Sequence, residues 1–179
     1  MNREQFEHTV RAAGVMLGVN DLLVIGSQAL HGSMSGDLPP EASRSVEVDV
    51  AVFEDTNARG ADVIDGSIGE ASMFHSTFGY YAHGVVETPA VLPMRWRERL
   101  VRFETPATGG VVAWCLDPHD LWISKAIADL DLITAHGSQR VVTFLHDARP
   151  DGHLAWVGDV TEPGIVDALT TWFGEPGPK

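Results

Sequence analysis

Residues 46–52 read Val-Glu-Val-Asp-Val-Ala-Val, and this alternation of valines with acidic and small side chains decides the fold. Successive side chains of a β-strand point to opposite faces, so a period of two predicts a strand. Glu47 and Asp49 then share one face, and the valines share the other. The residues that we expect in the core of the sheet are Val46, Val48 and Val50, joined by Leu23 and Ile25.

A helix and a buried strand are predicted before this stretch. Apolar residues recur at steps of three and four between Arg3 and Leu17, which is typical of an amphipathic helix that ends at Gly18. The short apolar run 22–25, closed by Gly26, indicates a buried strand. The apolar positions of the helix are Phe6, Val10, Ala13 and Met16 or Leu17.

The turn after the buried strand is predicted to begin another helix, because Ser27 occupies the place of an N-cap or first-turn hydroxyl. Nineteen residues separate Ser27 from Glu47, enough for one helix and a loop to return the chain to a neighbouring strand. We therefore expect the carboxylates of Glu47 and Asp49 to face the turn at Gly26 and Ser27.

The remaining pattern predicts an α/β core followed by a helical part. Segment 58–68 is predicted to be helical, and segments 78–86, 100–103 and 111–114 are predicted to be extended. Asp117 as N-cap and Pro118 at the first helical position indicate a helix that runs through Leu132. Further helices are expected at 140–145 and 165–173. The predicted organisation is a core at 1–116, a helical C-terminal part at 117–173, and a tail at 174–179 that should fray.

Composition narrows the class of protein. The chain has 179 residues, 44% of them hydrophobic and 21% charged, which is a globular composition. The longest apolar runs fall far short of the roughly 18 residues of a membrane span, and Glu4 and Glu7 do not fit a signal peptide. Cys115 is the only cysteine, so no intrachain disulfide forms, which fits a reducing compartment. We expect a cytoplasmic protein without a membrane partner.

The formal net charge of −13 opposes binding of nucleic acid by the surface as a whole. One local basic run remains, with aromatic residues beside it, and it is either a solvated face or a nucleic-acid contact. The run comprises Arg95, Arg97, Arg99 and Arg102, with Trp96 and Phe103.

Several catalytic motifs are missing from the sequence: a phosphate loop, a zinc-protease helix, a serine nucleophile elbow and a dinucleotide-binding turn. The eight histidines are scattered without the spacing of zinc ligands. Glu47 and Asp49 remain as the strongest candidates for chemistry, because two neighbouring carboxylates repel each other unless a cation such as Mg²⁺ offsets their charge. The alternative for this pair is a solvated strand face.

The turn at Gly26 and Ser27 is the second candidate. A glycine lets the chain approach a ligand closely, and a helix that begins there would present its N–H groups to a triphosphate. The alternative is a simple helix cap. A Gly-Ser turn after one strand and an acid-x-acid pair on the next resembles the polymerase-beta-like nucleotidyltransferase superfamily.

A closer resemblance, over roughly residues 23–128, is to an uncharacterised bacterial nucleotidyltransferase-like family related to the AbiEii-type abortive-infection toxins. The stretches that carry it are Ile25-Gly26-Ser27-Gln28-Ala29, Arg44-Ser45-Val46-Glu47-Val48-Asp49-Val50, Asp65-Gly66-Ser67-Ile68-Gly69-Glu70, Phe78-Gly79-Tyr80-Tyr81 and Cys115-Leu116-Asp117-Pro118-His119-Asp120-Leu121. This resemblance implies a nucleotidyltransferase-like mixed sheet flanked by helices, with a helical C-terminal part.

The resemblance also implies a function and its residues. Glu47 and Asp49 would be the catalytic, Mg²⁺-binding pair, Gly26 and Ser27 would hold the NTP phosphates, and Lys125 would offset phosphate charge. The expected activity is transfer of a nucleoside monophosphate from an NTP to RNA or protein, in a toxin–antitoxin or phage-defence system with an antitoxin-like partner.

Two features leave a second interpretation open. The basic run that follows Ala128 in the relatives is replaced here by residues 129–137, which read Asp-Leu-Asp-Leu-Ile-Thr-Ala-His-Gly. A third carboxylate completes many sites of the superfamily, and the sequence offers only Glu87 or Glu104 beside Thr-Pro turns. The alternative function is a catalytically inactive binding or regulatory module.

Overall fold

The computed structural model describes residues 1–36, 38, 42–55, 57–86 and 92–125. The chain divides into two compact units, one of Met1–Pro89 with Arg97–Pro118 and one of Ala90–Trp96 with His119–Lys179. None of the helices in the described ranges combines the length and the apolar character that a membrane crossing requires. The domain limits expected from the sequence, at 116 and 173, stay a prediction.

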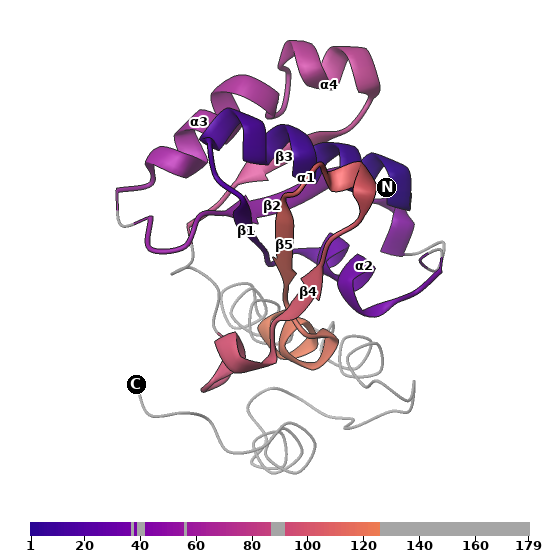
Figure 1. The fold of residues 1–179 in the computed structure, drawn as a ribbon, viewed down its shortest axis with the longest axis vertical. Helices are drawn as coiled ribbons and strands as arrows, with labels where there is room; N and C mark the ends of the chain where they lie inside the picture. The colour runs from indigo at the N-terminus through magenta and orange to yellow at the C-terminus, as the bar shows by residue number, and fades with distance from the viewer. Residues whose placement is uncertain (37, 39–41, 56, 87–91, 126–179) are drawn as a thin grey trace, which may run out of the picture. The chain divides into compact units, whose positions relative to one another are not determined.

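The first unit is built on a five-stranded mixed sheet with the strand order β3-β2-β1-β5-β4 (Figure 1). β1 (Asp21–Val24) pairs antiparallel with β2 (Glu47–Ala51) and parallel with β5 (Val112–Cys115). β3 (Tyr81–Gly84) runs parallel to β2 at one edge, and β4 (Val101–Phe103) runs antiparallel to β5 at the other. The predicted return of the chain from β1 to a neighbouring strand is confirmed.

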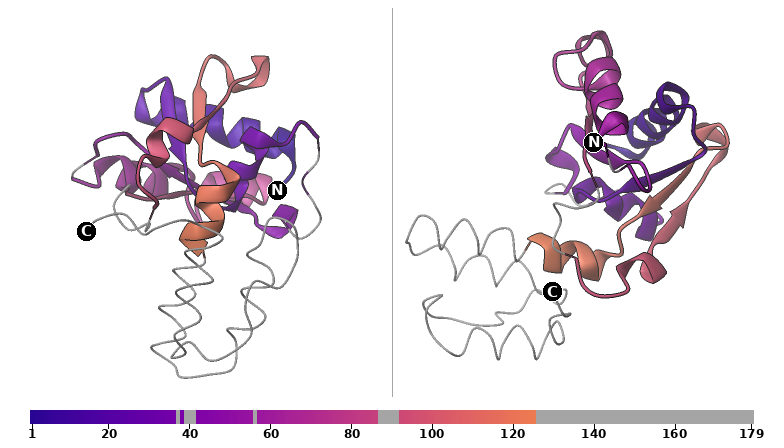
Figure 2. Two further views of the ribbon diagram at one scale, coloured as in Figure 1. Left: turned by 90° about the horizontal axis from the view of Figure 1, so that it is seen from below. Right: turned by 90° about the vertical axis from the view of Figure 1, so that its left-hand side faces the viewer.

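Helices lie against this sheet, as the two further views in Figure 2 show. α1 (Arg3–Leu17) has the predicted bounds, with a capping box between Asn2 and Gln5 and the left-handed Gly18 at its end. α3 (Arg59–Ile68) packs beside α1 and against β3, and α4 (Met73–Phe78) follows it. An α/β fold with a mixed sheet is therefore what this sequence forms.

The strand register shows which side chains share a face. Val48 and Val50 lie in register with Ala82 and Gly84, on the sheet face against which α1 and α3 pack. Val50 is opposite Val24 in β1, so Val24 and not Leu23 joins the valines, contrary to the expected core. Leu23 is opposite Ala51 on the carboxylate face, where both are buried. The central strands are buried on both faces of the sheet, so an apolar residue such as Leu23 can lie on either face, and its apolar character does not predict which one.

Other expectations about local structure need correction. Val46 is 47% exposed because it precedes β2 and is not part of it, and Ile25 is half-buried just beyond β1. Of the two alternatives at the end of the apolar stripe of α1, Met16 is exposed and Leu17 is half-buried, whereas Phe6, Val10 and Ala13 are buried as predicted. Segment 78–86 is strand only at Tyr81–Gly84, since Phe78 ends α4.

The helix expected after Ser27 is much shorter than a regular helix. Ser27–Ala29 forms the 3₁₀ turn η1, and α2 (Leu30–Ser33) adds only one turn. Two further 3₁₀ turns precede strands, η2 (Ala42–Arg44) before β2 and η3 (Trp96–Arg99) before β4. A third, η4 (Pro106–Thr108), joins β4 to β5.

The second unit is described over only a short part. Residues 118–125 are helical, which agrees with the predicted start at Asp117 and Pro118. The predicted end of this helix at Leu132, the helices at 140–145 and 165–173 and the tail at 174–179 lie outside the described residues.

Candidate functional site

The turn at Gly26 and the acid pair on β2 meet in the structure. A Cβ atom built on Gly26 would lie 1.7 Å from Oδ2 of Asp49 and 2.7 Å from its Cγ. The main chains meet as well, since the Ile25 N–H donates to the Asp49 carbonyl oxygen at 3.3 Å. The predicted approach of the carboxylates to the Gly-Ser turn is present at Asp49.

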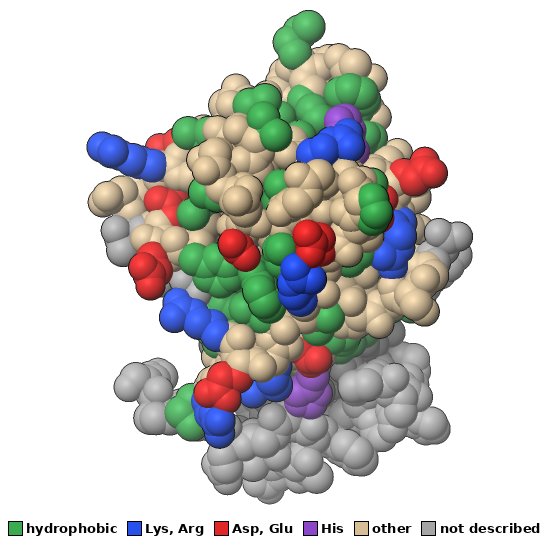
Figure 3. Space-filling model, viewed as in Figure 1, with side chains coloured by type: hydrophobic (Ala, Val, Ile, Leu, Met, Phe, Trp, Pro, Cys, Tyr) green, Lys and Arg blue, Asp and Glu red, His purple; other side chains and the backbone are tan. Residues whose placement is uncertain are grey.

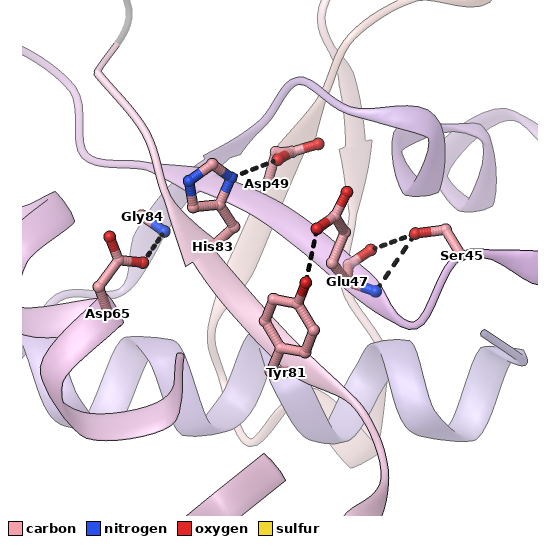
Figure 4. A network of polar contacts seen from close by, with 7 residues as sticks. All are labelled: Ser45, Glu47, Asp49, Asp65, Tyr81, His83 and Gly84. Carbon is pink, nitrogen blue, oxygen red and sulfur yellow. Dashed lines mark hydrogen bonds and ion pairs between the residues drawn. The ribbon is translucent and has the colours of Figure 1, made fainter. Parts of the chain in front are cut away.

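Glu47 and Asp49 project from the sheet face opposite Val48 and Val50, and each contacts the residue beside it in β3. The Tyr81 hydroxyl donates to Oε2 of Glu47 at 2.8 Å, and Nδ1 of His83 lies 3.1 Å from Oδ1 of Asp49. These pairs follow from the parallel register, in which Glu47 is matched with Tyr81 and Asp49 with His83 (Figure 4). The strand next to β2 thus provides one polar partner for each acid.

The electrostatic environment of these groups is acidic. The pKa of Tyr81 is raised to about 12, first by its hydrogen bond to Glu47, then by desolvation and by the negative charges of Glu47, Glu70 and Asp49. The phenol therefore stays protonated and donates to Glu47 over the whole neutral range. The Asp49 side chain is 25% exposed and that of His83 is 51% exposed, so the site opens to solvent.

An open pocket adjoins the acid pair at the edge of the sheet. Its lining consists of Glu47, Asp65, Glu70, Tyr81 and His83. Asp65 lies on α3 and accepts a hydrogen bond from the Gly84 N–H at 2.7 Å, which ties the helix to the edge strand. Three of the five lining residues are carboxylates, so the pocket favours cationic groups over bare anions.

The fit to Mg²⁺ follows from this donor set. Within the described residues, no three His, Cys, Asp or Glu side chains converge to hold a metal ion by themselves. Mg²⁺ is commonly held by one or two carboxylates together with substrate phosphates and water. Glu47 and Asp49 match that kind of shared site rather than a cage made only of protein ligands.

The two side chains predicted to bind phosphate, Ser27 and Lys125, belong to different units of the chain. Ser27 is half-buried in η1, directly after Gly26, and its Oγ accepts a 3.5 Å contact from the Gln28 amide. The short helix that follows gives little of the helix dipole that a long helix would aim at phosphate. Lys125 is exposed and belongs to the second unit, so its role beside phosphate stays a prediction.

The third carboxylate is not provided by Glu104. That residue follows β4, which is separated from β2 by two strands, β1 and β5, and it pairs with Arg102. The exclusion is topological, because the hairpin of β4 and β5 places the residue at the opposite edge of the sheet. The other candidate, Glu87, lies outside the described residues.

Arg102 belongs to the basic run that the sequence leaves open, and its pairing with Glu104 reduces the positive charge there. Arg97 and Arg99 are exposed in η3, with Glu98 between them. On the face seen in Figure 3, basic side chains are interspersed with acidic and hydrophobic ones. The nucleic-acid contact and the solvated face that the sequence leaves open for this run both stay predictions.

Sequence reasoning missed the partners from β3. Tyr81 and His83 alternate with the small residues Ala82 and Gly84, which is a period of two like that of β2. This alternation was available as a signal for polar side chains on one face. What it does not contain is the register that places them beside Glu47 and Asp49.

Comparisons with protein-family models, with curated proteins and with solved structures found no match for this chain. The resemblance to nucleotidyltransferases therefore stays an expectation from the motifs quoted above.

Proposed function

We propose that this protein binds an NTP with Mg²⁺ and transfers its nucleoside monophosphate group to RNA or protein. The observation that carries the proposal is the contact of the Gly26 turn with Asp49, on the sheet face that also presents Glu47. A close-approaching glycine turn beside two carboxylates is the combination that a metal-bound triphosphate needs, because backbone and metal ligands must reach the same phosphates.

Each residue has a defined role in this proposal. Glu47 and Asp49 would hold Mg²⁺, and the missing side chain at Gly26 lets the turn lie directly against the Asp49 carboxylate. Ser27 and Lys125 contact the outer phosphates, with Lys125 supplying a compact positive charge. Bound Mg²⁺ would neutralise phosphate charge and orient the triphosphate. An acceptor hydroxyl would attack the α-phosphorus in line and lose its proton to water, while the bond from that phosphorus to the oxygen that bridges to the β-phosphate breaks and pyrophosphate leaves.

The biological role that we propose rests on the same motifs. A transferase of this kind, related by motif to abortive-infection toxins, would act in the cytoplasm in a toxin–antitoxin or phage-defence system with an antitoxin-like partner. Fold and motif alone do not fix a function, so the site chemistry has to be tested first.

The second candidate is a binding or regulatory module without catalysis. It is favoured by the place of Glu104 at the far edge of the sheet, which leaves the acid pair without that third carboxylate. Such a module would still bind Mg²⁺-NTP at Glu47 and Asp49. The two candidates therefore differ in turnover and not in binding.

Thermal denaturation with and without Mg²⁺ and each of the four NTPs tests the proposal. We expect the wild type to be stabilised only when both Mg²⁺ and an NTP are present, because a ligand that binds the folded state raises the melting temperature. Asp49→Asn should abolish the stabilisation. The matched control is Asp21→Asn, since Asp21 lies on β1 on the same sheet face and accepts from Trp114 Nε1 at 2.8 Å.

Pyrophosphate release then separates the candidates. A wild type that is stabilised by Mg²⁺-NTP and releases pyrophosphate with an acceptor is a transferase, and one that only binds is a module. Absence of any ion-dependent shift with all four NTPs would overturn both.

A further inference from the structure

We infer that Tyr81 is a positioning residue of this site, whose hydroxyl holds the Glu47 carboxylate in the orientation that metal binding requires. The inference rests on the proposed function, because it assigns the metal to Glu47 and Asp49. The geometry that carries it is the 2.8 Å hydrogen bond from Tyr81 to Oε2 of Glu47.

The contact is built into the backbone. β2 and β3 are parallel neighbours with Glu47 and Tyr81 directly in register, so both side chains leave the same face of adjacent strands. The main chain at Glu47 is fixed too, because Ser45 Oγ accepts from its N–H and donates to its carbonyl oxygen, each at 3.2 Å. Glu47 is therefore held at both its backbone and its carboxylate (Figure 4).

A glutamate needs such support more than an aspartate does. Its side chain has an additional rotatable bond, and an unrestrained carboxylate must be ordered when it binds a metal. A carboxylate has lone pairs for several partners, so the bond from Tyr81 to Oε2 leaves Oε1 available to a cation. Groups that orient a metal ligand in this way raise metal affinity without touching the metal.

Tyr81 is itself held and kept in the donor form. Its ring centroid lies 4.7 Å from that of His75, whose Nδ1 accepts from the Ala71 N–H at 3.1 Å. A phenol is protonated at neutral pH at its ordinary pKa of about 10, so the Tyr81 hydroxyl is in the form that donates to a carboxylate.

The neighbouring tyrosine offers a matched control. The Tyr80 hydroxyl contacts Nδ1 of His8 at 2.7 Å, and its ring packs with those of His8, Phe74 and Phe78, away from the carboxylates. Tyr80→Phe therefore removes the same hydroxyl and a comparable hydrogen bond, one residue away in the sequence. A general loss of stability affects both variants, whereas a positioning role affects only Tyr81→Phe.

The test measures binding of Mn²⁺ alone by electron paramagnetic resonance, and the Mg²⁺ concentration that gives half of the NTP-dependent thermal shift. We expect Tyr81→Phe to raise the Mn²⁺ dissociation constant and the Mg²⁺ concentration at half of the thermal shift, each by roughly tenfold or more. This is the usual effect of removing a group that orients a metal ligand. Tyr80→Phe should leave both unchanged. In a transferase assay, Tyr81→Phe should be restored toward wild-type rates by added Mg²⁺.

A second variant tests whether Tyr81 acts through Glu47. Glu47→Asp keeps a carboxylate that is one methylene shorter and does not reach the Tyr81 hydroxyl in its present position. In that background Tyr81→Phe should have no further effect on Mn²⁺ affinity, because coupled residues are not additive.

The outcomes separate the two proposals. If the wild type binds Mn²⁺ and Mg²⁺-NTP but Tyr81→Phe binds both equally well, the positioning role is overturned and the proposed function stands. If a folded wild type binds neither, the metal site is absent and both are overturned.

Discussion

Gly26 and Asp49 are so close that no side chain fits at residue 26 while the Asp49 carboxylate keeps its position. The backbone angles of Gly26, φ −83° and ψ −170°, are extended and accessible to any residue. The glycine is therefore required for space and not for conformation. Alanine can adopt the same extended backbone, so Gly26→Ala tests only the steric contact with the Asp49 carboxylate.

Gly26→Ala should displace the Asp49 carboxylate and break its contact with His83. We expect loss of the Mg²⁺-NTP-dependent thermal shift together with a moderate cost in stability, about 1–3 kcal/mol, which is typical of an overpacked contact. Urea denaturation gives the stability, and thermal denaturation with and without Mg²⁺-NTP gives the binding.

Asp49→Ala provides the control for this cycle. Of the three atoms nearest to a methyl group at residue 26, only the Cβ of residue 49, at 3.1 Å, remains in that background. Gly26→Ala should then cost much less than it does in the wild type. An equal cost in both backgrounds would show that the Asp49 carboxylate is not what the methyl group displaces.

Val48 tests the register of the central strand. Its side chain is fully buried on the helix-facing side of β2, so Val48→Asp places an unpaired charge in the core. We expect it to unfold the first unit, a loss of more than about 4 kcal/mol. Circular dichroism with urea measures this.

Val46→Asp is the matched control, since it makes the same change two residues earlier in the same alternating stretch. Val46 is 47% exposed, and the variant should change stability by no more than about 0.5 kcal/mol. A cooperative, wild-type-like Val48→Asp would contradict the register described here.

The sequence predicted local features of this fold well because they depend on nearby residues. The period of two at 46–52 identified β2 and placed Glu47 and Asp49 on one face, and the apolar steps of three and four, closed by Gly18, predicted the bounds of α1. The open turn at Gly26 was also visible, because glycine and serine directly follow an apolar run.

Pairing between strands was where prediction failed. Assigning Leu23 to the face of the valines was wrong by one residue, because the antiparallel register sets Val24, and not Leu23, opposite Val50. The same kind of information decides that Tyr81 and His83 meet Glu47 and Asp49. No local pattern contains the offset between two strands, so the partners of the acid pair needed the structure.

α4 was missed for a different reason. It has six residues, capped by Ser72 and by the left-handed Gly79, and none of them is buried. A helix this short shows no amphipathic period, so its apolar pattern could not identify it before the strand at Tyr81.

Gly84 tests how closely the edge strand and α3 pack. A Cβ atom on Gly84 would lie 2.2 Å from the carbonyl oxygen of Ala61 and 2.6 Å from its Cα. Since these are backbone atoms of a helix, Gly84→Ala must push α3 away from β3, at a cost of about 3 kcal/mol or more. Urea denaturation followed by circular dichroism gives the value.

The control for this prediction is Gly66→Ala on the same helix. Apart from its chain neighbours and the nearby backbone of α3 itself, no atom lies within 4 Å of a Cβ built on Gly66, and alanine has a higher helix propensity than glycine. Gly66→Ala should stabilise the protein by about 0.5–1 kcal/mol. If Gly84→Ala were also neutral or stabilising, α3 would not pack against β3 at this distance.

The two neighbouring tyrosines, Tyr80 and Tyr81, should both ionise at a higher pH in the folded protein than in the unfolded chain. The pKa of Tyr81 is raised to about 12, chiefly by its hydrogen bond to Glu47, and that of Tyr80 is raised by burial against an opposing effect of Arg11. Unfolded tyrosine has a pKa of about 10. The ultraviolet absorbance of tyrosinate should therefore rise at higher pH in the folded protein than in the protein unfolded by urea.

The direction of the stability change follows from the same shift. Between pH 10 and about 12 the unfolded chain has released the Tyr81 proton and the folded protein retains it. The contribution of Tyr81 to the free energy of unfolding is therefore fully present below pH 10 and is lost as the pH rises toward 12. Glu47→Gln removes the charge and the strongest acceptor, and should move the Tyr81 ionisation back toward 10. Glu4→Gln, an exposed acid in the first turn of α1, is the control and should leave it unchanged. A Tyr81 that titrates near 10 in the folded wild type would show that its hydroxyl does not donate to Glu47 in solution.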